Sequence, residues 1–154
     1  MKPFIYGALL SLAAMPALAA CSEDRVTVVG DWGRANFAVQ VADDNEERAQ
    51  GLMFVEEMAM LEGMLFVYDA PRRASFWMRN TLIPLDMLFV SADGTIKKVH
   101  ENAIPLDETG IDGGPDITFV LEINGGLSSR LGIAAGDVLQ HPRIVENAVL
   151  PCEG

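Results

Sequence analysis

Residues 85–100 read Leu-Asp-Met-Leu-Phe-Val-Ser-Ala-Asp-Gly-Thr-Ile-Lys-Lys-Val-His. The first six residues are nearly all apolar, which is typical of a buried strand. Ser91-Ala92-Asp93-Gly94 has the composition of a hairpin turn, and residues 95–100 return as a second β-prone run. This stretch therefore predicts two antiparallel strands.

The segments on either side of this hairpin share its two-residue hydrophobic period. Residues 117–123 alternate cleanly, and residues 37–41 place Phe37, Val39 and Val41 on one face. We expect the remaining strands at residues 26–30, 64–68 and 75–78 and just after Gly136-Asp137, with a turn at 69–71.

Helices are expected to be few and short. Asp43 or Asp44 predicts an N-cap, and Gly51 ends that helix after about two turns. Residues 56–61 and 127–131 are each expected to form a helical turn, and residues 101–116 to form the longest loop. Seven or eight short strands with one or two short helices predict a mainly β fold, a compact sandwich or barrel.

The first 20 residues have the features of a signal peptide. Lys2 supplies a positive charge, residues 4–18 are mostly apolar, and Ala17-Leu18-Ala19 has the small-x-small pattern of a cleavage site. Because the apolar run of 15 residues is shorter than a membrane span, we expect a cleaved signal peptide rather than a membrane-spanning helix. The sequence thus predicts a periplasmic or secreted protein with a single domain over residues 21–154 and no transmembrane span.

The chain has two cysteines, Cys21 and Cys152, near the ends of the expected domain. A disulfide between them suits an oxidising compartment. Leu18-Ala19-Ala20-Cys21 also resembles a lipobox, so a lipid anchor at Cys21 is the alternative, and free thiols are the third. The disulfide is favoured because β-prone residues begin at Val26, which leaves little room for a tether.

The composition excludes several kinds of partner and cofactor. The formal charge of −11 leaves no basic surface for nucleic acid or for electrostatic attraction to anionic lipid. His100 and His141 lack the spacing of paired metal ligands. Six methionines suit a copper(I) site or a flexible core, and their apolar neighbours favour the core. We expect no metal and no cofactor.

Charged residues inside apolar strands are the main candidates for function. Asp86 and Glu122 are each flanked by apolar residues, and a buried carboxylate needs a partner. They could be structural, could form a ligand cleft with Arg79, or could act as a catalytic pair in an envelope hydrolase. Trp77 could be a binding platform or a core residue. The candidate ligand-binding residues are Trp77, Arg79, Asn80, Asp86, Glu122 and Asn124; no residue is assigned a catalytic role.

Several blocks of sequence occur together in one order: Gly51-Leu52-Met53, Gly63-Met64-Leu65-Phe66, Phe76-Trp77-Met78-Arg79-Asn80-Thr81, Pro84-Leu85-Asp86, Leu121-Glu122-Ile123-Asn124-Gly125-Gly126 and Gly136-Asp137. Over residues 36–141 the chain resembles the DUF192 family, also called UPF0127, of small bacterial and archaeal proteins. The resemblance implies a jelly-roll-like fold and frequent export, and it implies no established activity. We therefore expect an exported, non-catalytic domain that binds a small molecule or an envelope protein; the alternatives are the hydrolase and a purely structural domain.

Overall fold

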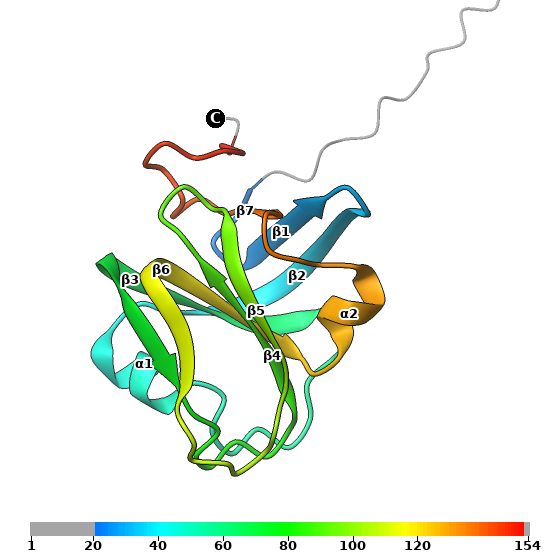
Figure 1. Cartoon of the computed structure of the whole chain (residues 1–154), viewed down its shortest axis with the longest axis vertical. Coiled ribbons are helices and arrows are strands. Elements are labelled where there is room, and N and C mark those ends of the chain that lie inside the picture. Colours follow the sequence, from blue (N-terminus) through cyan, green and yellow to red (C-terminus); the bar gives the residue numbers. More distant parts are fainter. Residues whose placement is uncertain (1–20, 153–154) are drawn as a thin grey trace, which may run out of the picture.

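The computed structural model describes residues 21–152, so the predicted signal peptide lies outside the described residues. This part of the chain forms seven strands and two short helices (Figure 1). In chain order they are β1 (Arg25–Gly30), β2 (Gly33–Ala42), α1 (Asn45–Gln50), β3 (Glu62–Phe76), β4 (Leu85–Val90), β5 (Ile96–Ala103), β6 (Ile111–Asn124), α2 (Leu127–Leu131) and β7 (Val138–Gln140).

All seven strands belong to one sheet, in the order β5-β4-β6-β3-β2-β1-β7. The sheet curls into a half-barrel, and its two edges meet at one end, where Thr95 forms a bridge with Val138. Every pairing is antiparallel except that of β2 with β3. The predicted hairpin of residues 85–100 is β4 paired with β5. The expectation of a mainly β fold with one or two short helices is confirmed.

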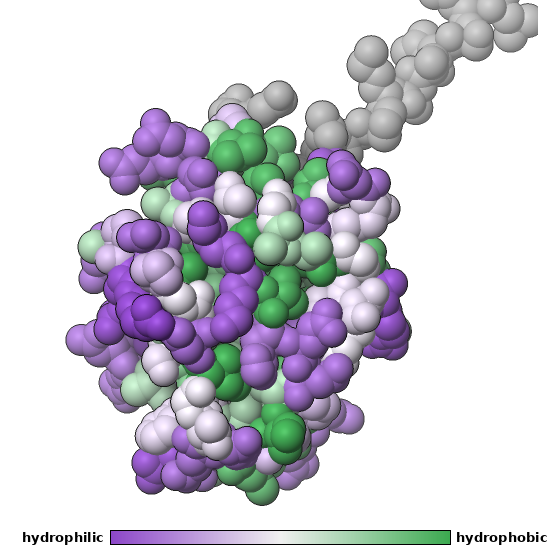
Figure 2. Space-filling model, viewed as in Figure 1, coloured by the Kyte–Doolittle hydropathy of each residue, from purple (hydrophilic) through white to green (hydrophobic). Residues whose placement is uncertain are grey.

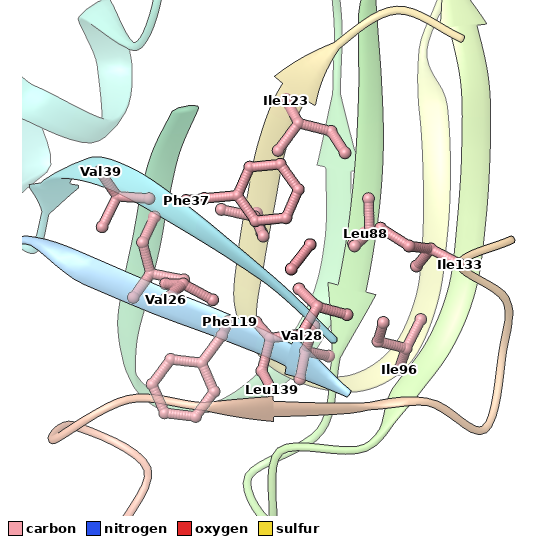
Figure 3. Close-up of a cluster of buried hydrophobic side chains, with 14 of the residues drawn as sticks. Val26, Val28, Phe37, Val39, Leu88, Ile96, Phe119, Ile123, Ile133 and Leu139 are labelled. Atoms are coloured by element: carbon pink, nitrogen blue, oxygen red, sulfur yellow. The ribbon is translucent and has the colours of Figure 1, made fainter. Parts of the chain in front are cut away.

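The inside of the curl holds the first hydrophobic core, to which all seven strands contribute. Val26, Phe37 and Leu139 from one side of the curl meet Leu88 and Ile96 from the other (Figure 3). All five side chains are fully buried. Because strands from both edges of the sheet share this core, burial of its apolar surface stabilises the curled shape.

A second core lies on the opposite face of β3, β4 and β6. There Phe76 packs edge-to-face against Phe66 and Phe89, with ring centroids 5.1 and 5.9 Å apart. The far ends of β3 and β6 bend over this face, and Gly113 touches the ring of Phe89 so closely that a Cβ atom would not fit. A glycine at position 113 therefore allows the two layers to come together.

The structure corrects three details of the predicted elements. Residues 69–71 are not a turn between two strands but part of the continuous strand β3, whose pairing with β6 shifts register between Val67 and Arg72. Residues 56–61 are not helical, and the long loop shrinks to residues 104–110 because β5 and β6 extend into it. In each case pairing with a distant strand or loop outweighs the local signal.

The local predictions for the two helices hold. Asp44 is the N-cap of α1, where its side chain accepts a hydrogen bond from the backbone N–H of Glu47 at 2.8 Å, and Gly51 is the C-cap. Gly126 precedes α2 with a φ of 76°. No helix within residues 21–152 has the length and apolar character needed to cross a membrane.

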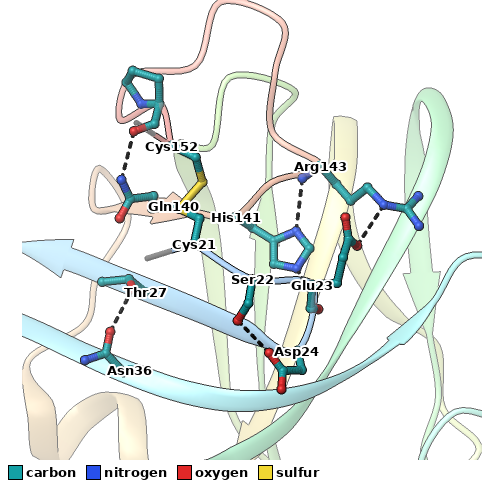
Figure 4. The surroundings of a disulfide bond; sticks show 11 residues. Cys21, Ser22, Glu23, Asp24, Thr27, Asn36, Gln140, His141, Arg143 and Cys152 are labelled. Atoms are coloured by element: carbon teal, nitrogen blue, oxygen red, sulfur yellow. Dashed lines mark hydrogen bonds and ion pairs between the residues drawn. A yellow bond between two sulfur atoms is a disulfide. The ribbon is translucent and has the colours of Figure 1, made fainter. Parts of the chain in front are cut away.

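Cys21 and Cys152 form a disulfide, which confirms the favoured pairing (Figure 4). The segments next to these cysteines also contact each other, because the ring of the buried His141 lies 3.0 Å from the carbonyl oxygen of Glu23. Arg143 pairs with Glu23 at 3.0 Å and with Asp43 at 2.7 Å. The C-terminal segment is thus fastened to the start of the domain.

Candidate functional site

Asp86 is fully buried and accepts four hydrogen bonds. Its Oδ1 accepts from the backbone N–H groups of Asn102 and Gly126, both at 2.8 Å. Its Oδ2 accepts from the N–H and the hydroxyl of Ser128, at 2.8 and 2.6 Å. The carboxylate therefore joins the end of β5 to the start of α2, as the structural interpretation predicts.

Glu122 lies on the other face of the sheet. Its cross-strand neighbours are Met64 and Met87, which belong to the second core. The side chain is almost completely buried, and this burial raises the pKa of its carboxyl group to about 8. Glu122 is therefore a protonated, neutral side chain at pH 7, flanked by two thioethers.

Arg79 joins neither carboxylate. Its side chain is half exposed, and its ion pair is with Glu108, at 3.8 Å. The structure thus does not bring Arg79, Asp86 and Glu122 into one cleft, and the convergence required for a shared binding or catalytic site is absent from the described residues.

Two asparagines among the candidate residues hold loops in place. The side-chain amide of Asn124 donates to the carbonyl oxygens of Met58, Ala59 and Met60, at 3.4, 2.8 and 3.4 Å. Asn80 has a positive φ of 54°, and its carbonyl oxygen accepts from another loop. Both side chains are partly buried.

Three loops come together at one end of the half-barrel, the lower end in Figure 1: residues 51–61, 77–84 and 104–110. We call this region the loop end. It carries seven large apolar residues that are 42–66% exposed, and apolar surface is visible there in Figure 2. Met60 and Leu61 lead directly into β3. The other five, which we call the apolar patch, are Phe54, Trp77, Leu82, Ile104 and Leu106.

Two residues of the patch have an unusual backbone conformation. Phe54 and Leu106 both have a φ of 64°, in the left-handed region that bulky residues rarely adopt. The N–H of Phe54 donates to the carbonyl of Asn80 at 2.9 Å, and the N–H of Leu106 donates to that of Thr81 at 3.1 Å. Two consecutive carbonyls thus hold two strained residues whose side chains are 66% and 61% exposed.

Trp77 is part of the surface rather than the core, with 46% of the residue exposed. The guanidinium carbon of Arg79 lies 5.3 Å from the centroid of its ring, which is cation–π geometry. Because Arg79 also pairs with Glu108, the contact links the second and third loops. This arrangement presents an aromatic face beside a guanidinium group.

Two cavities flank the loop end. One, of about 260 Å³, lies between residues 52–58 and the neighbouring ends of β2 and β3. The other, of about 370 Å³, lies between β5 and residues 104–112, with Met78 in its wall. Within residues 21–152, no three His, Cys, Asp or Glu side chains lie close enough together to hold a metal ion.

Phe54, Leu82, Ile104 and Leu106 are the patch residues that the sequence did not single out. Each is an apolar residue within an irregular segment, where no two-residue or helical period tells a buried apolar residue from an exposed one. The sequence did identify Trp77 and Arg79, which belong to the same surface. Of the other candidate residues, Asp86 and Asn124 hold the loops and Glu122 lies inside the second core.

Comparisons with known proteins place the chain in a family. Solved structures with the same fold include a protein from Sinorhizobium meliloti 1021 described as a "putative transcription regulator" and a protein of unknown function from Novosphingobium aromaticivorans DSM 12444. The first is 42% identical, with a TM-score of 0.73 over 79% of this chain and 95% of the other. The second is 40% identical, with a TM-score of 0.74 over 90% of this chain and 99% of the other.

No curated protein matches the chain. The model of the DUF192 family, described as "Uncharacterized ACR", matches residues 26–141, which include all of the seven strands except the first residue of β1. This protein therefore belongs to the DUF192 family.

Proposed function

We propose that this protein is an exported, non-catalytic binding domain of the cell envelope, and that the loop end is the surface that binds its partner. The observation that carries the proposal is the pair Phe54 and Leu106. Each residue adopts a backbone conformation that costs about 1–2 kcal/mol, and each exposes its apolar side chain to water. A fold optimised for stability alone would have glycine or asparagine at these positions.

The arrangement of the carboxylates favours binding over the hydrolase. General acid–base cleavage needs two carboxyl groups that face the same bond. Asp86 and Glu122 lie on opposite faces of the sheet, and the oxygens of Asp86 already accept four hydrogen bonds. The regulator description of the Sinorhizobium protein is not extended to this chain, because a net charge of −11 disfavours DNA.

The disulfide supports the proposal of export. A bond between Cys21 and Cys152 persists in an oxidising compartment and is rare in the cytosol. It also occupies the sulfur atom that a lipid anchor would need. Expression of the full chain in a bacterium, followed by fractionation and intact-mass measurement, tests both points. We expect a periplasmic or secreted species that begins at Cys21 and is lighter than the dithiol by two hydrogen atoms; a lipid-bearing mass or a cytosolic location would contradict the proposal.

Site-specific photo-crosslinking in the same cells tests the binding surface. A photoreactive amino acid replaces Ile104 at the loop end or, as the control, Val145, which is 78% exposed in the segment between β7 and Cys152. We expect a discrete crosslinked product from position 104 only, and its loss when Phe54→Asn and Leu106→Asn are added. Equal products from both positions, or none from position 104, would favour a purely structural domain.

A further inference from the structure

The charges around the apolar patch identify the kind of partner it fits. We propose that the loop end binds a cationic segment of polypeptide, whose apolar side chains cover the patch and whose lysine or arginine side chains enter the two flanking cavities. This inference rests on the proposed function and adds the chemistry of the partner.

The loops that carry the patch are themselves acidic. Residues 51–61, 77–84 and 104–110 contain one basic residue, Arg79, and four acidic residues, so their formal charge is 1 − 4 = −3. The acidic residues, all exposed, are Glu56, Glu57, Asp107 and Glu108. Since Glu108 already offsets Arg79, the remaining carboxylates surround the patch without a cationic partner on these loops.

The first cavity has no basic residue in its lining. Asp24, Glu57 and Glu62 supply three carboxylates, and the apolar part of the wall includes Leu52 and Val55. An aliphatic chain that ends in a cation matches both parts of this lining, because its methylene groups contact the apolar wall while its charge stays near the carboxylates.

The second cavity, on the other side of the patch, is also lined by carboxylates and apolar residues. Its lining contains the carboxylates of Glu101, Asp107 and Asp112 together with Lys98 and His100, and the ammonium group of Lys98 donates to the carbonyl oxygen of Asp112 at 2.5 Å. The carboxylate of Asp112 is paired with Arg73, so Glu101 and Asp107 are the lining carboxylates without an ion pair among the described residues. Ile104, which belongs to the patch, forms part of the same wall. A chain crossing the patch would therefore meet negative potential at both ends.

The same charges disfavour two other occupants. A bilayer with anionic lipids would be repelled by the loop carboxylates and by the overall charge of −11. A second copy of the chain would bring an identical acidic surface against the first, and like charges in an interface cost binding energy. An apolar patch with an acidic surround is complementary to an apolar segment with basic flanks.

Fluorescence anisotropy with labelled peptides tests the proposal on the full disulfide-bonded protein. The probe is a short amphipathic peptide of leucine and lysine, and the matched peptide has glutamate in place of lysine. We expect binding of the lysine peptide only, weakened severalfold at about 1 M salt, where the Debye length is about 3 Å. The variant Phe54→Asn/Leu106→Asn should lose affinity on the order of tenfold, which corresponds to about 1.4 kcal/mol.

Two further variants test whether binding depends on the apolar patch and its cavities or only on the overall negative charge of the protein. Val145→Ser/Val149→Ser removes exposed apolar side chains elsewhere and should leave affinity unchanged. Glu57→Gln/Asp107→Asn removes one carboxylate from each cavity and should weaken binding and reduce its salt dependence. Circular dichroism of each variant confirms that it is folded.

Three results would overturn the inference. They are equal binding of the two peptides, binding that survives loss of Phe54 and Leu106, and patch-dependent co-sedimentation with phosphatidylcholine or phosphatidylglycerol vesicles in place of peptide binding. If crosslinking from position 104 succeeds while the lysine peptide fails to bind, the binding function stands and the cationic partner is wrong. If crosslinking fails as well, both proposals fall.

Discussion

Asp86 and Glu122 lie on adjacent strands of one sheet but point to opposite faces. Asp86 is directly opposite Ile123, which belongs to the core inside the curl, and Glu122 is opposite Met87, which belongs to the second core. Directly opposite residues share a face, so the offset of one position places the two carboxyl groups in different cores. One accepts four hydrogen bonds, and the other is neutral among apolar side chains.

Replacement of Asp86 by Asn should destabilise the fold. An amide cannot accept all four hydrogen bonds, and its NH2 group would face donors from Gly126 or Ser128. We expect a loss of about 3 kcal/mol in the free energy of unfolding, because the acceptor in these bonds is a carboxylate. Urea unfolding measures it. The control Ser128→Ala, which removes only the hydroxyl donor, should cost less; an unchanged midpoint for Asp86→Asn would show that the carboxylate has another role.

Glu122→Gln should change how stability depends on pH. The pKa of Glu122 is about 8 in the folded chain against 4.5 for the free group, so the folded state holds one more proton between these values. Its contribution to stability is therefore fully present below pH 4.5 and is lost as the pH rises towards 8. Glutamine mimics the neutral form at every pH and should abolish this loss.

Urea unfolding at pH 5 and at pH 8 gives the measurement for Glu122→Gln. At pH 8 we expect the free energy of unfolding of the variant to exceed that of the parent by on the order of several kcal/mol. Near pH 5 the two values should be about the same. The exposed Glu101→Gln serves as the control and should follow the parent at both pH values. If the free energy of unfolding changed equally between the two pH values in Glu122→Gln and in the parent, this would contradict a buried, protonated carboxyl group.

Phe54→Asn and Leu106→Asn should keep or raise the stability of the fold. Asparagine tolerates the left-handed conformation better than a bulky apolar residue, and neither side chain contributes to the buried cores. We expect each change to raise the free energy of unfolding by as much as about 1 kcal/mol, which is measured as a higher melting temperature. Phe54→Leu, which retains the unfavourable backbone, is the control. A marked loss of stability would mean that these side chains support the loops.

Loss of the disulfide should weaken the fold through the unfolded state. Cys21 and Cys152 are 131 positions apart, and the chain-entropy argument gives up to about 4–5 kcal/mol for a loop of this length. Urea unfolding with and without a reductant measures the effect. The variant Cys21→Ser/Cys152→Ser should have the stability of the reduced protein and no response to reductant; a parent unaffected by reduction would contradict the stabilising role.

The sequence predicts the local elements well because their causes are local. Alternation of apolar residues identifies β6, Asp44 and Gly51 delimit α1, and residues 91–94 separate β4 from β5. The turn expected at residues 69–71 fails for a physical reason. Asp-Ala-Pro favours a turn by itself, but here the strand continues through it with shifted register, since β6 supplies a partner on both sides of the irregularity.

For the candidate site residues, the sequence predicts burial but not which side chains lie together, and function depends on the latter. A charge within an apolar strand shows that a carboxylate is buried, and both Asp86 and Glu122 are. It does not show on which face, because the two-residue period orders faces within a strand and leaves the alignment of two strands open. That alignment comes from pairing β4 with β6, more than thirty residues later in the chain.

The amino-acid sequence by itself determined the β class, the strand and turn positions, the acidic charge and the cysteines available for pairing, since each follows from neighbouring residues or from composition. Only the tertiary structure decided that Asp86 and Glu122 are separated, and that three loops meet to expose Phe54, Trp77 and Leu106. The physical reason is that a strained backbone persists only where remote groups hold it. Here those groups are the carbonyls of Asn80 and Thr81, which belong to a different loop from either residue they hold.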